Sequence, residues 1–195
     1  HLHFAPFAKG FPKPTIGGSA WDGVEIAQLC REVGMKAVAL VDNIFPSVKD
    51  AYYANKMVPE VQTLGGVTLN KTVGTLNAEA ADFAIRLGGK FVKLYTLSTP
   101  VWAKLEKLYP GRFGLGVPLK PTTVFDEKGQ LTTEAKKVID VIAKGDVAMH
   151  TGHATVEEIF AIIDYSRDVG IRPERIVVTH VDQMTIAHID EEIAP

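Results

Sequence analysis

Short apolar runs alternate with longer segments of helical periodicity along almost the whole of this 195-residue chain. The apolar run 37–41, for example, follows a segment from Asp22 to Val33 in which apolar residues recur at helical spacing and a glycine comes next. This alternation is typical of βα units, in which parallel strands are joined by helical crossovers. The sequence therefore predicts an α/β fold of about six βα units.

The expected elements follow in a regular order, with no linker or low-complexity segment between them. Asn77 is a predicted helix N-cap, for a helix that would bury Ala81, Ala84 and Leu87. The segment 109–129, rich in Gly and Pro, is a predicted ordered loop of the kind that often forms a lid or binding loop. We predict a single domain over residues 1–195, with strands at 1–4, 37–41, 66–69, 91–97, 146–149 and 175–179.

Composition and charge narrow the kinds of partner. The chain is 46% hydrophobic and 23% charged, and its formal net charge is only -2, so nothing favours nucleic acid or an acidic membrane surface. No apolar stretch approaches the roughly 20 residues that span a bilayer. Cys30 is the only cysteine, which excludes an internal disulfide and fits a buried thiol in a reducing cytoplasm. We expect a cytoplasmic protein with a small-molecule substrate.

Five of the six histidines lie at or just after the predicted carboxyl ends of strands, the edge at which parallel α/β folds bind ligands. The first two are two residues apart, so on a strand both would point to one face, about 6.6 Å apart. Imidazole suits zinc, and also manganese or iron, better than hard cations. Each histidine alone has a simpler explanation, as a structural or surface residue or part of an affinity tag. Together they predict a divalent metal site with the candidate ligands His1, His3, His150, His153 and His180.

Four short motifs resemble the amidohydrolase superfamily of metal-dependent hydrolases, and in particular an uncharacterised bacterial branch of it. They are the segments 1–6 (HLHFAP), 73–77 (VGTLN), 151–153 (TGH) and 178–180 (VTH), in the order that the superfamily requires. The resemblance covers nearly the whole chain. It implies a (β/α) TIM-type barrel and one or two divalent metal ions, with His1, His3, His153 and His180 as matched ligands. It implies no counterpart for His150.

The resemblance also implies a bridging ligand and a proton carrier. Lys93, in the fourth strand, would be a carbamylated lysine between two metal ions; alternatively it points outward or pairs with a carboxylate, because the sequence does not fix which way it faces. The superfamily's strand-eight Asp has no counterpart before the chain ends. Asp182 is the nearest substitute, and Asp42 is another, although both are also explained as helix caps. Asn43 and Asn70 are candidates for orienting polar groups of a substrate.

The length bears on the completeness of this fold. An eight-stranded barrel needs about 250 residues, whereas this chain accounts for six strands and opens on a histidine rather than Met. We expect a processed protein or part of a longer one, with the last strands missing from this chain. Otherwise the barrel is open, or another subunit closes it in a homo-oligomer.

The predicted function is hydrolysis of an amide, lactone or cyclic C–N bond in a small molecule by a metal-activated water. One alternative is a phosphoesterase of the polymerase-and-histidinol-phosphatase type, which also opens with His-x-His but needs more carboxylate ligands than this sequence offers. A second is a barrel that binds a metal or ligand without turnover. Fold resemblance alone does not distinguish the three.

Overall fold

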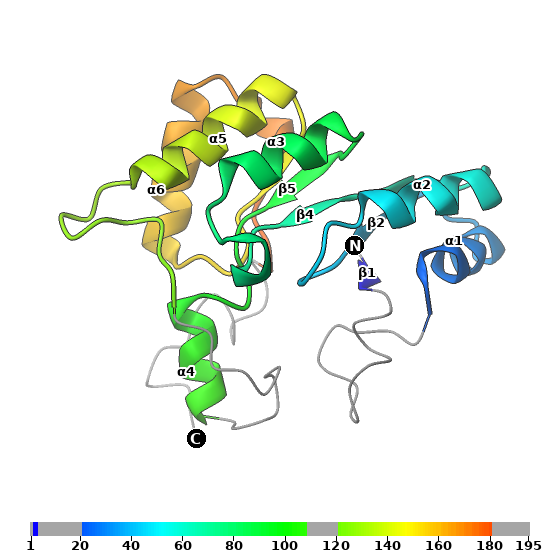
Figure 1. Cartoon of the computed structure of the whole chain (residues 1–195), viewed down its shortest axis with the longest axis horizontal. Coiled ribbons are helices and arrows are strands. Elements are labelled where there is room, and N and C mark those ends of the chain that lie inside the picture. The colour runs from blue at the N-terminus through cyan, green and yellow to red at the C-terminus, as the bar shows by residue number, and fades with distance from the viewer. Residues whose placement is uncertain (1, 4–20, 109–120, 181–195) are drawn as a thin grey trace.

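The computed structural model describes residues 2–3, 21–108 and 121–180 (Figure 1). These residues form an α/β fold in which parallel strands alternate with helices. The strands are β1 (Leu2–His3), β2 (Ala37–Val41), β3 (Gln62–Leu64), β4 (Gly66–Thr68), β5 (Phe91–Lys93), β6 (Ala148–His150) and β7 (Ile176–Val177). The helices are α1 (Gly23–Glu32), α2 (Val48–Met57), α3 (Ala78–Arg86), α4 (Pro100–Leu108), α5 (Thr133–Gly145) and α6 (Val156–Asp168), with short 3-10 turns at Lys71–Val73 and Pro173–Arg175.

All strand pairs are parallel, and neighbours in space are neighbours in sequence. One sheet has the order β1-β2-β3 and the other β4-β5-β6-β7. Only Gly65 separates β3 from β4, so one extended segment pairs first with β2 and then with β5. Ser47 joins the two sheets, because its hydroxyl donates to the Leu40 carbonyl at 2.7 Å and accepts from the Gly66 amide at 3.0 Å. Each of the six predicted strand positions overlaps an observed strand, although residues 1 and 4 of the first lie outside the described residues. Strand β6 spans Ala148–His150 rather than 146–149, and β7 only Ile176–Val177 rather than 175–179.

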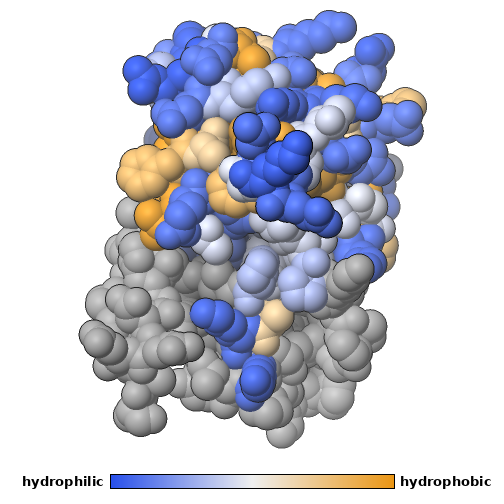
Figure 2. Space-filling view, turned by 90° about the vertical axis from the view of Figure 1, so that its left-hand side faces the viewer, coloured by the Kyte–Doolittle hydropathy of each residue, from blue (hydrophilic) through white to orange (hydrophobic). Residues whose placement is uncertain are grey.

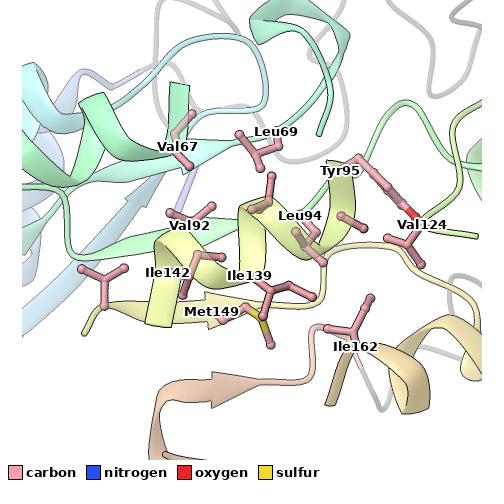
Figure 3. Packing of buried hydrophobic residues seen from close by; sticks show 14 of the residues in the cluster. Val67, Leu69, Val92, Leu94, Tyr95, Val124, Ile139, Ile142, Met149 and Ile162 are labelled. Atoms are coloured by element: carbon pink, nitrogen blue, oxygen red, sulfur yellow. The ribbon is translucent and has the colours of Figure 1, made fainter. Parts of the chain in front are cut away.

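Helices α1 and α2 pack on one face of the first sheet, and α3, α5 and α6 pack on one face of the second. Val38 and Leu40 of β2 lie in a buried cluster with residues of α1 and α2. A larger cluster joins Val67, Val92 and Met149, from β4, β5 and β6, to α3, α5 and α6. Figure 3 shows Val92 and Met149 beside Ile139 and Ile142 of α5. Since successive strand residues point to opposite faces, the residues that alternate with them lie on the face against which none of these five helices packs.

Side-chain caps fix where several helices begin. Asp22 and Thr155 each form a capping box, with Glu25 and Glu158 respectively, at the starts of α1 and α6. Asn77 accepts hydrogen bonds from two backbone amides of α3, which confirms the predicted cap.

Several predictions about element boundaries were wrong. Strand β5 ends at Lys93 rather than at residue 97, because the chain turns there into a hydrogen-bonded loop. Strand β3 and helix α4 were not predicted. Leu87 is 74% exposed, because α3 ends at Arg86 and Leu87 is only its C-cap. Cys30 is buried, as expected.

The surface over α5 and α6 is mostly polar. Figure 2 shows hydrophilic side chains covering most of the described part of this face, with apolar groups scattered among them. Such scattered apolar groups are normal on a protein surface. Within the ranges that the structure describes, no helix is long and apolar enough to cross a membrane.

Candidate functional site

Three polar side chains lie next to one another where β4, β5 and β6 end. Lys93 is in register with Thr68 on one side and with His150 on the other. All three alternate with the residues that pack against α3, α5 and α6, so they point to the opposite face of the sheet. We call Thr68, Lys93 and His150 the inner-face cluster. The open question of which way Lys93 points is thereby settled: it points inward.

The members of the inner-face cluster are buried, and two of them have a side-chain polar atom that no described residue hydrogen-bonds. Thr68 is 2%, Lys93 1% and His150 9% exposed. Among the described residues, neither Thr68 Oγ1 nor His150 Nδ1 has a hydrogen-bond partner. No Asp or Glu in those ranges forms an ion pair with Lys93. Buried polar atoms without partners are rare in folded proteins, because each costs desolvation energy.

Burial also sets the charge of this cluster. It lowers the pKa of the Lys93 ammonium to about 8. Burial and the nearby Lys93 charge lower the pKa of His150 to about 4. His150 is therefore neutral near pH 7, and its ring lies 5.2 Å from that of Phe91, centroid to centroid.

A second group, the rim pair, consists of His153 and His180 in the turns that follow β6 and β7. Their ring centroids are 5.2 Å apart. Two hydrogen bonds tie the turns together: the Gly152 amide donates to Thr179 Oγ1 at 3.2 Å, and the Thr179 amide to Thr151 Oγ1 at 3.0 Å. His180 itself has φ +58°, a strained conformation that residues other than glycine adopt mainly where the surroundings impose it.

The His153 ring is fixed in one tautomer. Its Nδ1 lies 3.1 Å from the Thr96 carbonyl oxygen, which can only accept, so Nδ1 carries the proton. The neutral ring then presents Nε2 as its acceptor nitrogen, the arrangement usual for metal-binding histidines. Trp102 of α4 stacks on the ring at a centroid distance of 5.7 Å.

Asn70 holds in place the loop that carries the Thr96 carbonyl. Its Oδ1 accepts from the Thr96 and Leu97 amides at 2.8 and 2.9 Å, and its Nδ2 donates to the Asn43 carbonyl at 2.8 Å and to Thr96 Oγ1 at 2.9 Å. Thr96 Oγ1 in turn donates to Asn43 Oδ1 at 3.1 Å. The Asn70 amide thus already uses its hydrogen-bonding groups within the protein. The sequence suggested Asn70 as a residue that orients substrate; in the structure it instead holds the loop that supports the site.

Replacing Asn70 with Ala should lower the free energy of unfolding by about 2 kcal/mol, because two buried backbone amides lose their acceptor. Asn77→Ala is the matched control, since it removes a helix cap at a cost of about 1 kcal/mol without touching this loop. Urea denaturation measures both values. A smaller loss for Asn70→Ala than for Asn77→Ala would contradict the role of Asn70 in this network.

The remaining predicted site residues fare differently. His1 and Asp182 lie outside the described residues. The backbone of His3 ends β1 and pairs with Val41, at the carboxyl end of β2. Asp42 accepts hydrogen bonds from the Ile44 and Phe45 amides and so stabilises a turn. It is not a helix cap, because Ser47 is the N-cap residue of the next helix, α2. Burial raises the pKa of Asp42.

The described histidines do not form one cluster. In the ranges 21–108 and 121–180, no three His, Cys, Asp or Glu side chains are grouped closely enough to hold a metal ion. His150 belongs to the inner-face cluster, and His153 and His180 form the rim pair. Sequence reasoning missed Thr68. Its signal was a polar residue at the end of a short strand, three residues before the 3-10 turn Lys71–Val73.

The whole chain matches one protein family. The match, to the family of unknown function DUF6282, runs over residues 1–194. The chain belongs to the DUF6282 family. No curated protein matches this DUF6282 member. Among solved structures it is similar to a dihydropteroate synthase from Clostridium difficile, crystallised in the presence of pteroic acid, at 13% identity and a TM-score of 0.37. That match covers 90% of this chain and 62% of the synthase chain.

Proposed function

We propose that this protein is a metal-dependent hydrolase that acts on an amide, lactone or cyclic C–N bond of a small molecule. The observation that carries the proposal is the rim pair, in which His153 is held in the tautomer that a metal ligand needs, beside His180. Both lie where parallel strands end, the edge at which α/β folds place their sites. The amidohydrolase resemblance of the sequence supports the same reaction class.

The proposed architecture is a (β/α) TIM-type barrel. Parallel strands that follow the chain order, with helices packed on one face, are what such a barrel requires. The inner-face cluster would then point into the barrel interior at its carboxyl end. Closure would bring β1, which carries His3, toward the strands of the rim pair.

The residues present fit a divalent metal ion. His153 and His180 would hold it together with the strand-one pair, His1 and His3. We assign the metal to this set and not to His150, because the ammonium of Lys93 in the neighbouring strand would repel a cation there. Zinc, and also manganese or iron, suits imidazole ligands.

A metal ion bound there would supply a hydroxide at neutral pH and polarise the bond to be broken. The chain's own residues do the rest. The Thr96 carbonyl keeps the proton on His153 Nδ1. The Thr151 and Thr179 hydroxyls hold the two histidine turns together, because each accepts from a backbone amide of the other turn. Asp182 is the proposed carrier of the proton to the leaving group.

Metal content tests the proposal most directly. Protein purified after growth with zinc, manganese and iron should contain at least one ion per chain by elemental analysis. His153→Asn and His180→Asn should each lower metal affinity by about 10- to 100-fold or more. His150→Asn is the matched control and should keep the metal. Absence of metal from the unaltered protein would overturn the proposal, and loss of metal from His150→Asn would overturn the ligand assignment.

A substrate panel tests the reaction. Amides and lactones should be hydrolysed by the metal-loaded protein and not by His180→Asn. Turnover of phosphoesters alone would favour a phosphoesterase of the polymerase-and-histidinol-phosphatase type. Metal binding without any turnover would favour a metal- or ligand-binding barrel that is not an enzyme.

A further inference from the structure

We propose that the inner-face cluster of Thr68, Lys93 and His150 binds a carboxylate, so that the substrate is a small molecule bearing a free carboxylate group. As a statement about the substrate this rests on the proposed hydrolase function. The binding of a carboxylate to the cluster does not depend on it and can be measured separately.

The first argument is charge. Lys93 is 1% exposed, and no Asp or Glu of the described residues pairs with it. An unpaired ammonium in a protein interior costs several kcal/mol, whereas a hydrogen-bonded ion pair recovers much of that cost. A carboxylate brought by a ligand would supply the missing negative charge, and a metal cation would not.

The second argument is the position of the flanking groups. Thr68 and His150 stand in register on either side of Lys93, in strands about 4.8 Å apart. Each has one buried polar atom without a partner among the described residues, Thr68 Oγ1 and His150 Nδ1. A carboxylate has two oxygens with about four acceptor positions. It can therefore accept from the ammonium, from the hydroxyl and from an Nδ1–H of neutral His150.

The third argument is how the same face of the sheet is filled on the side of the cluster toward the amino ends of the strands. Phe91 lies two residues before Lys93 in β5, is 3% exposed, and has its ring beside that of His150. Gly66 is opposite Phe91 in β4, where a Cβ would lie 2.6 Å from the Phe91 ring. The aromatic ring thus fills the side toward the amino ends of the strands. A ligand would reach the cluster from the carboxyl edge, where the rim pair lies.

Acetate and acetamide make the sharpest pair of probes, because they have nearly the same shape and differ in charge. The experiment uses metal-free full-length protein labelled with 15N at histidine, and follows the His150 imidazole nitrogen signals during titration with each compound. Acetate should shift the His150 Nδ1 signal in a saturable manner. Acetamide should bind at least about tenfold more weakly, since it lacks the charge that Lys93 needs.

Variants locate the binding. Lys93→Met keeps the length of the side chain, removes the charge and should abolish the acetate-induced shift. Lys90→Met, at the exposed residue just before β5, is the matched control and should bind acetate normally. Thr68→Val should weaken acetate binding by about tenfold to 100-fold, the value of one hydrogen bond to a charged group.

Three results would overturn the carboxylate site: equal binding of acetate and acetamide, acetate binding retained in Lys93→Met, or a bicarbonate-dependent mass increase that places a carbamate on Lys93. Failure of the hydrolase proposal would look different. In that case the protein would bind acetate at Lys93 but hold no metal. Conversely, a metal-loaded protein that hydrolyses neutral amides and ignores acetate would retain the function and lose this substrate class.

Discussion

Replacing Lys93 with Met should raise the free energy of unfolding of the metal-free protein by about 3 kcal/mol at pH 7. The lysine is 1% exposed, and burial lowers its pKa from 10.5 to about 8. That shift means that the folded protein holds the ammonium less favourably than water does. Met fills nearly the same space without a charge. Urea denaturation at pH 7 measures the difference, and Lys90→Met should change stability by less than about 0.5 kcal/mol.

The effect should depend on pH with a definite sign. Between pH 8, the folded pKa, and pH 10.5, the unfolded pKa, the unfolded chain binds the Lys93 proton more strongly than the folded protein does. The stability of the unaltered protein therefore rises with pH across that window relative to Lys93→Met. The advantage of the variant is complete below pH 8 and disappears toward pH 10.5. A destabilised Lys93→Met would show instead that an acidic partner inside the protein already pairs with the lysine.

A more stable variant that has lost its function is a common signature of a functional site, since binding groups are retained at a cost in stability. Lys93→Met should accordingly be more stable and unable to bind acetate. A lysine retained only for packing would also be destabilising when buried and charged, but the unaltered protein would then bind no acetate.

Replacing Gly152 with Ala should lower the free energy of unfolding by at least about 3 kcal/mol. Gly152 has φ +67°, and an added Cβ would collide with the Tyr95 carbonyl oxygen and lie 2.6 Å from that of Leu94. Both carbonyls belong to the backbone of the neighbouring loop and cannot turn aside. The left-handed conformation adds about 1–2 kcal/mol for any residue with a Cβ. Urea denaturation again provides the measurement.

Gly170→Ala separates the collision from the backbone strain. Gly170 also has a positive φ, +87°, but an added Cβ there meets nothing within 4 Å. Gly170→Ala should lower the free energy of unfolding only by the cost of the left-handed conformation, about 1–2 kcal/mol. The excess for Gly152→Ala should be accompanied by weaker metal binding, because the turn places His153. Equal losses in the two variants would contradict the close packing of this turn against the loop after β5.

Local sequence signals predicted most of the fold's framework. The helix cap at Asn77 depends on only a few neighbouring residues, because its side-chain oxygen accepts from amides of the next turn. The 37–41 strand was predicted with its observed bounds, since five successive nonpolar residues need cover on both faces. Strand β5 was predicted too long because apolar residues continue to Leu97. They are buried there by a loop that Asn70 holds, and such a distant contact leaves no local signal.

The sequence by itself determined the α/β class, the order of the strand positions and the placement of His150, His153 and His180 near strand ends. Only the tertiary structure decided that His150 belongs to the inner-face cluster and that His153 and His180 form the rim pair. Whether Lys93 faces inward depends on which side of β5 the helices cover, and its neighbours Thr68 and His150 depend on strand register. Both are set by packing between segments far apart in the chain. A shift of one residue in a strand would turn every side chain to the other face.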